Sequence, residues 1–266
     1  MCQTCGCSTG HKQGHGHDHQ HDHGEDHDHT HGHGHHHHEQ DTEHRAIEVN
    51  TALLGQNDKL AERNRGIFLA RGIAVMNLVS SPGSGKTMLL EKTLQLFGNE
   101  LKLAVIVGDL ATENDAMRLR RHGSPAIQIQ TGTVCHLDAH MIHHAIEDLK
   151  LSDLDILFIE NVGNLVCPSA FDLGEDARIV LTSVTEGEDK PLKYPSIFQD
   201  AELVLLNKTD LSAAVEFDRE TALRNIREAA PGAKILEISA KTGDGLGGWF
   251  EYLRQLSRRK KSAMPK

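Results

Sequence analysis

The sequence lacks several features, and each absence excludes a class of protein. No stretch of its 266 residues approaches the roughly 18 consecutive apolar residues that span a bilayer, and its start lacks the basic and apolar regions of a signal peptide. We therefore expect a cytosolic protein with no membrane partner. A net charge of −10 gives no reason to expect nucleic-acid binding, and the short basic run Arg258 to Lys261 is interpreted as a solvated tail.

Cysteine is scarce, and its number is odd. Five cysteines in a reducing compartment favour thiolate ligands over disulfides. Three of them, Cys2, Cys5 and Cys7, fall within six residues, and Gly6 gives the backbone the freedom to bring them together. This cluster is predicted to chelate a metal ion by itself.

Apolar residues are almost missing from residues 1–44, which hold all but five of the 20 histidines among Gly, Asp and Glu. Such a segment cannot offset its chain entropy, so we predict a disordered tail without metal. Its many His-x-His pairs favour buffering or storage of divalent ions over a solvated linker. Residues 45–71 then have loosely helical spacing of apolar residues, and this segment could cover the following domain or serve a partner.

From residue 72 to 258, apolar strands alternate with amphipathic helices, and 259–266 form a basic tail. This alternation predicts an α/β domain with a mostly parallel sheet, helices on both faces and ligands at the carboxyl ends of the strands. The predicted strands lie near 73–79, 103–108, 126–129, 155–160, 178–184, 203–207 and 234–239. The predicted helices lie near 86–98, 113–122, 136–149, 194–200, 216–229 and 246–258.

The run from Pro82 to Thr87 follows the first predicted strand and opens a helix. Backbone N–H groups of such a Gly-rich turn, here at Gly83, Ser84 and Gly85, can bind phosphate oxygens at the helix N-terminus. Lys86 would reach the β- and γ-phosphates, and the Thr87 hydroxyl would ligate Mg²⁺. Only the first Gly of the usual pattern is missing, since Ser80 stands there. The run therefore predicts the phosphate loop of a P-loop NTPase.

Two further strand ends predict which base is bound. Asn207, Lys208 and Asp210 form an NKxD motif, in which the Asp carboxylate accepts from N1–H and the 2-amino group of guanine while the Asn amide meets its other edge. About 30 residues later, Ser239, Ala240 and Lys241 resemble the SAK loop that backs the guanine ring in GTPases. Adenine lacks both donors, so the pair of motifs predicts GTP and GDP and argues against an ATP-dependent kinase.

Carboxylates at two more strand ends are Mg²⁺ candidates. Asp109 lies in the polar turn after the second predicted strand, and Glu160 stands at the end of the fourth, ahead of a turn that contains Gly163. With Thr87 they make three ligands; a helix N-cap is the alternative for Asp109. No residue is marked by sequence alone as an arginine finger or a water-positioning glutamine, so we expect slow intrinsic hydrolysis.

A second metal site is predicted inside the domain. Cys135 and His136 are expected to open a helix, and Cys167 follows Glu160 by a few residues. Buried cysteines acting as small hydrophobes are the alternative. Two thiols and one imidazole are one ligand short of a closed tetrahedral site, which a second copy across a two-fold axis could complete. The histidines at 122, 140, 143 and 144 are expected on solvated helix faces.

Taken together, these motifs resemble the HypB family of SIMIBI-class P-loop GTPases, which insert nickel during [NiFe]-hydrogenase maturation. The matching stretches are CxxCGC at 2–7, the His-rich insert, SSPGSGKT at 80–87, GDLATENDA at 108–116, TGTVCHLDA at 131–139, ENVGNLVCP at 160–168, NKTD at 207–210 and SAKTGDG at 239–245. By this resemblance, Cys2, Cys5 and Cys7 correspond to a high-affinity nickel site. Cys135, His136 and Cys167 correspond to a weaker site for Ni²⁺ or Zn²⁺ at the interface of a GTP-promoted homodimer.

The resemblance also implies partners: a HypA-type zinc and nickel protein, the hydrogenase large-subunit precursor and, in some organisms, a metal-binding peptidyl-prolyl isomerase. Two other interpretations are weighed against it. The urease-accessory nickel GTPases carry a Cys-Pro-His metal motif and lack the thiol-rich start, unlike this chain. Alternatively, the chain is chiefly a nickel store whose nucleotide domain controls oligomerisation.

Overall fold

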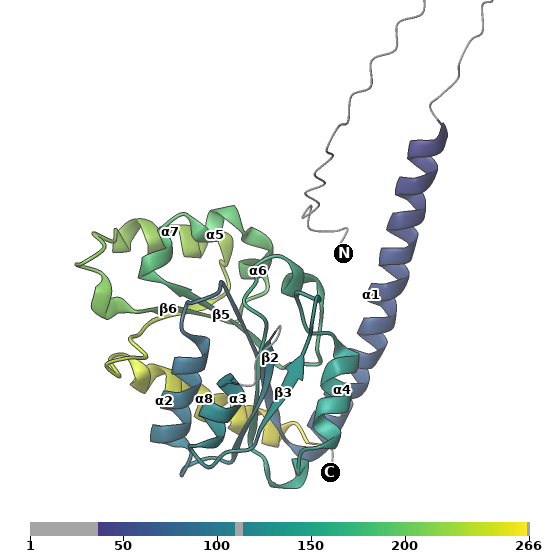
Figure 1. The fold of residues 1–266 in the computed structure, drawn as a ribbon. Coiled ribbons are helices and arrows are strands. Elements are labelled where there is room, and N and C mark those ends of the chain that lie inside the picture. Colours follow the sequence, from purple (N-terminus) through teal and green to yellow (C-terminus); the bar gives the residue numbers. More distant parts are fainter. Residues whose placement is uncertain (1–36, 110–113, 265–266) are drawn as a thin grey trace, which may run out of the picture. The chain divides into compact units, whose positions relative to one another are not determined.

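The computed structural model describes residues 37–109 and 114–264, with side chains from residue 51 onward. Seven strands form one sheet in the order β3-β2-β4-β1-β5-β6-β7, and all neighbouring strands are parallel (Figure 1). They are β1 (Ala74–Ser80), β2 (Leu103–Asp109), β3 (Ala126–Gln130), β4 (Ile156–Glu160), β5 (Ala177–Ser183), β6 (Leu203–Asn207) and β7 (Lys234–Glu237). The predicted parallel sheet and its seven strands are confirmed.

The helices that alternate with these strands are also near their predicted positions. They are α1 (His37–Arg71), α2 (Lys86–Phe97), α3 (Asn114–Arg120), α4 (Ala139–Glu147), α5 (Lys190–Lys193), α6 (Pro195–Gln199), α7 (Arg219–Ala229) and α8 (Leu246–Ser262). In the described part of the chain, four 3₁₀ turns accompany them: η1 (Leu151–Asp153), η2 (Cys167–Ala170), η3 (Val184–Glu186) and η4 (Thr209–Leu211). The short helix α5 was not predicted from the sequence.

Two apolar layers cover the sheet, one on each face. Successive side chains of a strand point to opposite faces, so in β1 Met76 and Leu78 enter the core beneath α2, α3 and α8, and Val75 enters the core beneath α1 and α4. A third cluster lies under α6 and α7. Figure 1 shows α2, α3 and α8 gathered together, with α1 and α4 side by side. Because both faces are covered, the strands contain the continuous apolar runs seen in the sequence.

Helix α1 begins earlier than predicted, at His37. The chain divides into two compact units, Met1–Leu53 and Leu54–Lys266. Within the second unit, α1 buries Ala61 and Phe68 completely. Residues 54–71 of α1 therefore cover the α/β domain, which was one of the two predicted uses. The predicted disordered tail lies mostly in residues 1–36, outside the described residues.

The C-terminal helix differs from the predicted solvated tail. Helix α8 continues to Ser262, and Lys260 is only 6% exposed. The Lys260 ammonium donates to Asp176 Oδ1 at 2.6 Å, and Lys261 pairs with Asp155. The basic run therefore docks on acidic residues near the amino ends of strands β4 and β5, because its charges have partners there.

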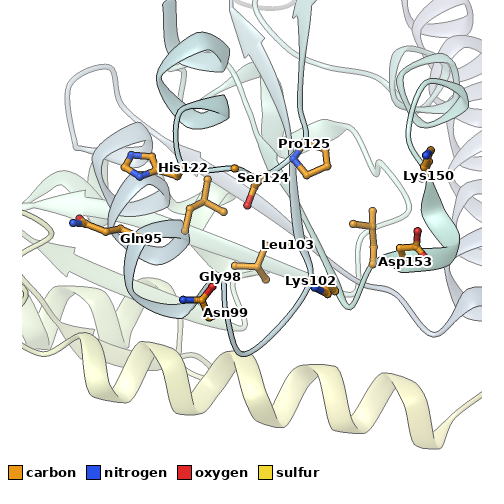
Figure 2. Close-up of a pocket in the computed structure, with 13 residues that line it drawn as sticks. Gln95, Gly98, Asn99, Lys102, Leu103, His122, Ser124, Pro125, Lys150 and Asp153 are labelled. Carbon is orange, nitrogen blue, oxygen red and sulfur yellow. The ribbon is translucent and has the colours of Figure 1, made fainter.

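Cavities occur at both ends of the parallel strands. One of about 620 Å³ lies at the amino ends of β2 and β3, where Gly98, Lys102, Ser124 and Lys150 contribute to its wall (Figure 2). Another of about 380 Å³ lies at the carboxyl ends, beside the phosphate loop. Parallel α/β sheets bind ligands at their carboxyl ends, so we place the site in the smaller cavity. None of the described helices has the length and hydropathy of a membrane span.

Candidate functional site

The loop between β1 and α2 has the backbone shape that its glycines predict. Gly83 and Gly85 have φ values of 74° and 105°, in the region that favours glycine. A Cβ atom on Gly85 would lie 2.6 Å from Asn207 Nδ2. Gly85 therefore has two physical requirements, its backbone angle and the close approach of the NKxD motif. The loop ends directly at Lys86, the first residue of α2.

Ser80, the departure from the usual phosphate-loop pattern, holds the loop lysine. Lys86 Nζ donates to Ser80 Oγ at 2.7 Å, and Ser84 Oγ donates to the same oxygen at 2.6 Å. Lys86 is 8% exposed, and burial lowers its pKa, while the nearby Glu160 opposes that shift. A neutral hydroxyl oxygen is a weaker acceptor for an ammonium group than an anionic phosphate oxygen. Lys86 can therefore exchange its bond to Ser80 for one to a phosphate.

Thr87 and Glu160 meet at the carboxyl ends of β1 and β4. Thr87 Oγ1 donates to Glu160 Oε1 at 2.7 Å, whereas Glu160 Oε2 is buried and has no hydrogen-bond partner among the described residues. Burial raises the pKa of Glu160 to about 7, and Lys86 and Thr87 counteract the shift. A buried carboxylate oxygen without a donor fits a cation. Thr87 and Glu160 are thus suited to hold Mg²⁺.

The cavity around these groups also contains residues that were not singled out from the sequence. Asp109, at the end of β2, lines it as predicted, together with Asp115 and Arg118 of α3. The Arg118 guanidinium pairs with Glu91 at 2.6 Å and with Asp115 at 3.2 Å. The available signal in the sequence was position alone, since Asp115 lies within the GDLATENDA stretch and Arg118 follows it by two residues. They place a carboxylate and a cation in the wall of the cavity.

The NKxD and SAK motifs lie next to each other at the ends of β6 and β7. Asn207 is 1% exposed; its Nδ2 donates to Ser84 O at 2.8 Å, and its Oδ1 accepts from Ala240 N at 3.0 Å. The predicted contact of Asn207 with guanine stays a prediction, since here the amide joins the phosphate loop to the SAK loop. Asp210 accepts from Ser239 Oγ at 2.7 Å and is exposed. Lys208 directly follows Asn207 in the chain, and Lys241 directly follows Ala240.

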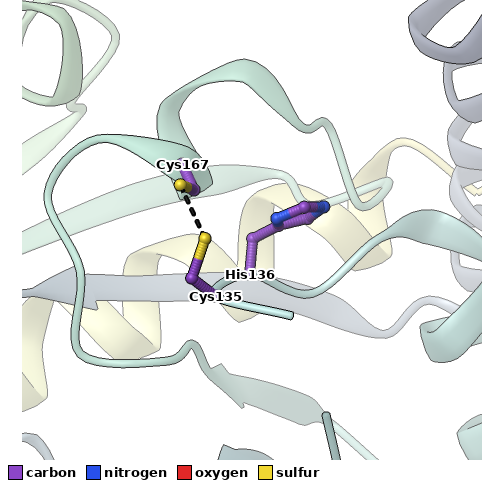
Figure 3. A group of neighbouring side chains, drawn as sticks. All are labelled: Cys135, His136 and Cys167. Carbon is purple, nitrogen blue, oxygen red and sulfur yellow. Dashed lines mark hydrogen bonds between the residues drawn. The ribbon is translucent and has the colours of Figure 1, made fainter. Parts of the chain in front are cut away.

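The structure brings together the three predicted domain ligands. The ligand atoms of Cys135, His136 and Cys167 all lie within 4.8 Å of one another. Both cysteines are thiols, and their sulphur atoms face each other at 2.7 Å (Figure 3). The His136 ring lies to one side and stacks on Phe171 with a centroid distance of 3.8 Å. Two soft sulphurs and an imidazole suit nickel, zinc or copper.

His136 is prepared for metal binding, although its place in the chain differs from the prediction. Helix α4 starts at Ala139, because Asp138 caps it by accepting from Met141 N at 2.8 Å. Cys135 and His136 therefore lie in the preceding loop instead of opening the helix. Burial lowers the pKa of His136, which favours the neutral imidazole, and its Nδ1 has no hydrogen-bond partner among the described residues.

One loop joins the phosphate cavity to the thiols. It begins at Glu160 and ends at Cys167, and on the way Asn161 Oδ1 accepts from Leu137 N at 3.3 Å. Asn164 Nδ2 donates to Cys135 O, also at 3.3 Å. A Cβ atom on Gly163 would lie 3.0 Å from Pro82 Cα of the phosphate loop. The loop therefore contacts both the nucleotide loop and the segment that carries Cys135 and His136.

Known proteins share this architecture and these motifs. The CobW/HypB/UreG nucleotide-binding domain family matches residues 74–237. Hydrogenase maturation factor HypB of Escherichia coli strain K12 is 53% identical over 212 residues, which cover 80% of this chain and 73% of that protein. The chain belongs to the HypB family. The domain family includes both HypB and UreG, so it does not separate them. The match over 212 residues is to HypB.

Solved HypB structures have the same fold. HypB from Archaeoglobus fulgidus superposes with a TM-score of 0.72 at 45% identity, covering 76% of this chain and 99% of that one. HypB from Helicobacter pylori in complex with nickel gives a TM-score of 0.74 at 41% identity, covering 77% and 97%. The resemblance to HypB and the P-loop NTPase fold are therefore confirmed. Cys2, Cys5 and Cys7 lie outside the described residues.

Positioning residues on α1 of this HypB-family chain were not predicted from the sequence. Asn57 Nδ2 donates to Asp172 O at 2.8 Å, and its Oδ1 accepts from Ala139 N at 2.9 Å. Asn64 donates to Ala139 O at 2.8 Å. These amides fasten the residues that follow the two loops with the candidate metal ligands. Polar residues among the apolar positions of α1 were the available signal, but their partners are more than 70 residues away.

Proposed function

We propose that this HypB-family chain is a GTP-hydrolysing nickel metallochaperone for [NiFe]-hydrogenase maturation. The observation that carries the proposal is the loop from Glu160 to Cys167, because it touches the nucleotide cavity at one end and supplies a thiol at the other. A change at the phosphates can therefore reach the metal ligands through a few residues of chain. The relatives named above, one of them solved with nickel, support the same assignment.

The nucleotide half of the proposal assigns roles to groups in the cavity. Backbone N–H groups of Gly83 to Thr87 bind the β- and γ-phosphates with Lys86, and Thr87, Asp109 and Glu160 hold Mg²⁺ directly or through its waters. Held by these residues, Mg²⁺ would supply positive charge against the charge that develops on the transferred phosphoryl group. Asp210 selects guanine, with Lys208, Ser239, Ala240 and Lys241 around the ring. Among the described residues that line the cavity, none is a glutamine or histidine that would orient water, so hydrolysis is slow.

Nickel is the cargo in this scheme, and the domain holds it with an incomplete ligand set. Cys135, His136 and Cys167 provide three donors, so a fourth comes from solvent, from a GTP-dependent second subunit or from a receiving protein. An open position lets the ion leave by ligand exchange. Zn²⁺ fits the same donors. Hydrolysis loosens the loop after Glu160 and thereby frees the ion.

The N-terminal segment completes the scheme. Cys2, Cys5 and Cys7 bind nickel tightly, and the histidines of residues 1–44 store further ions. The ion passes to the hydrogenase large-subunit precursor with the help of a HypA-type zinc and nickel protein, and a metal-binding peptidyl-prolyl isomerase is a further partner. These roles follow from membership of the family together with the donor chemistry of the segment.

Replacing Cys2, Cys5 and Cys7 by Ser tests the coupling in the full chain. Only Cys135 and Cys167 then remain as thiols, so thiolate-to-nickel charge-transfer absorption reports on the domain site despite the many histidines. Titration with Ni²⁺ at a chelator-buffered free concentration is compared with GDP and with a non-hydrolysable GTP analogue, both with Mg²⁺. We expect different nickel affinities in the two states. Equal affinities would overturn the proposed coupling. Cys167→Ser in the same background is the matched control, because it should reduce the charge-transfer absorption.

A further inference from the structure

A buried carboxylate that belongs to neither candidate site lies in the turn before β5. The Glu175 side chain is 8% exposed. Its Oε1 accepts from Asn77 Nδ2 at 3.0 Å and from Arg178 Nη2 at 3.4 Å, and its Oε2 accepts from Leu173 N at 2.7 Å. Burial raises the pKa of Glu175, while Arg178 and Asn77 counteract the shift. Because all three contacting groups donate, the position suits an ionised carboxylate better than a neutral amide.

Asn77 connects this carboxylate to the loop that follows Glu160. It lies in the middle of β1 and is fully buried, and its Oδ1 accepts from Asn161 Nδ2 at 3.2 Å. The Oδ1 atom of Asn161 accepts in turn from Leu137 N at 3.3 Å. A buried amide costs free energy unless its polar atoms are hydrogen-bonded. An apolar residue would fill this strand position without that cost, so we explain the amide by the two side chains that it joins.

Arg178 connects the same carboxylate to the segment of Cys167. Its side chain is 9% exposed, its Nη1 donates to Ser169 O at 3.2 Å, and its Nη2 donates to Phe171 O at 3.4 Å. These carbonyls lie two and four residues after Cys167. The Phe171 ring stacks on His136 at a centroid distance of 3.8 Å. Arg178 therefore supports the backbone behind one thiol and the ring against which the imidazole packs.

We propose that Asn77, Glu175 and Arg178 are positioning residues for the metal site. Their hydrogen bonds link Asn161 to the backbone that follows Cys167, in addition to the covalent link along the loop. A planar guanidinium fixes the two carbonyls in one geometry, so the thiol is held in place more firmly than a short loop alone would hold it. This inference rests on the proposed function, because it takes the two thiols and the imidazole as nickel ligands.

The competing interpretation is that these buried bonds only stabilise the fold. Asp176, the next residue after Glu175, provides the comparison. Asp176 Oδ2 accepts from Val75 N at 2.8 Å, and its Oδ1 accepts from Lys260 Nζ at 2.6 Å. These bonds join β1 and α8, and neither reaches the segments that carry the candidate metal ligands. A purely structural role predicts that loss of either carboxylate has the same effect on nickel binding.

Nickel titration of the full chain in the Cys→Ser background described above tests the inference. Free Ni²⁺ is fixed by a chelator, with GDP and Mg²⁺ present, and thiolate-to-nickel charge-transfer absorption reports both occupancy and ligand geometry. Glu175→Gln places an amide N–H group against a donor, so it should lower nickel affinity roughly tenfold and shift the absorption band. Asp176→Asn should change neither. GDP affinity should be the same in both variants, since neither residue lines the phosphate cavity.

Arg178→Lys is the second variant, because it keeps a cation beside Glu175 but loses the planar fork. It should also weaken nickel binding, and urea unfolding without metal shows that each variant is folded. Nickel affinities equal to the parent in Glu175→Gln and Arg178→Lys, or an equal loss in Glu175→Gln and Asp176→Asn, would overturn the inference. A parent chain without the band would overturn the proposed function as well, whereas a parent whose nickel affinity is the same with GDP and with the GTP analogue would overturn only the coupling.

Discussion

Replacing Asn57 by Ala removes one carboxamide that holds two loops on helix α1. The amide bonds Asp172 O at 2.8 Å and Ala139 N at 2.9 Å. Ala139 lies three residues after His136, and Asp172 lies five residues after Cys167. Asn57 is only 6% exposed, so bulk water does not take over its role. The substitution therefore leaves two backbone groups without their partner and loosens both segments that carry the candidate metal ligands.

The expected loss of stability follows from those two groups. A buried donor or acceptor left unsatisfied costs about 1–3 kcal/mol, so the two together should lower the free energy of unfolding by roughly 2–6 kcal/mol. Urea unfolding followed by circular dichroism, without nucleotide or metal, should show a lower midpoint at an unchanged slope. Nickel affinity at Cys135 and Cys167 should fall as well. GDP affinity should change little, since Asn57 does not line the phosphate cavity.

Two further variants make this prediction sharp. Gln56→Ala removes a neighbouring exposed amide from the same helix and should change stability by less than about 0.5 kcal/mol. Asn57→Asp keeps an acceptor for Ala139 N–H but places a carboxylate oxygen against Asp172 O, so it should destabilise the chain at least as much as Asn57→Ala. If Asn57→Ala unfolds at the same urea concentration as Gln56→Ala, the two hydrogen bonds do not hold the loops as argued.

Three other substitutions probe the nucleotide end. Gly163→Ala should weaken both GDP binding and nickel binding, because its Cβ would press on Pro82 at 3.0 Å; Gly232→Ala, with nothing within 4 Å, is the control, and equal effects would refute the contact. The pKa of Glu160 is raised to about 7 in the folded chain, against an ordinary 4.5. As pH rises, the unfolded chain therefore loses this proton at a lower pH than the folded chain. Without Mg²⁺ and nucleotide, the free energy of unfolding should therefore fall as pH rises from about 4.5 to 7, by about 3 kcal/mol from this group. Glu160→Gln should remove that part of the slope in urea unfolding at pH 5 and pH 8, and an unchanged slope would contradict the burial argument. Asp210→Ala should weaken GDP binding at least about a hundredfold in a fluorescent-nucleotide assay and leave ATP binding unchanged; a similar loss for both bases would contradict guanine selection.

The fold could be predicted from the sequence because its strands are buried on both faces. Such strands read as apolar runs, and glycine-rich or polar turns mark their ends, as at Ser80 and Asn207. The ends of the helices were less predictable. Asp138 sets the start of α4 through one capping hydrogen bond, and Lys260 extends α8 because Asp176 lies opposite. The spatial order of the strands depends on packing between distant segments, which periodicity does not encode.

The site was predicted where chemistry fixes residue types at short spacing. Lys86, Thr87 and the thiols belong to local motifs, so they could be singled out as candidates without coordinates. Ser80 as the partner of Lys86, and Arg118 in the cavity, required the folded chain. Asn57 and Asn164 act through backbone groups of other segments, and an amide that bonds a distant carbonyl leaves no pattern in the sequence.

The proposed coupling of nucleotide and metal would follow a short and specific route. Glu160 is fixed in the sheet, because β4 pairs with β1 on one side and with β2 on the other. A response to nucleotide is therefore expected in the stretch from Asn161 to Cys167. In this stretch Gly163 packs against Pro82, and Asn164 donates to the carbonyl of Cys135. Coupling between two sites is reciprocal. If phosphate contacts at Pro82 shift these ligands, an ion that draws Cys135 and Cys167 together must act on the phosphate loop with the same free energy.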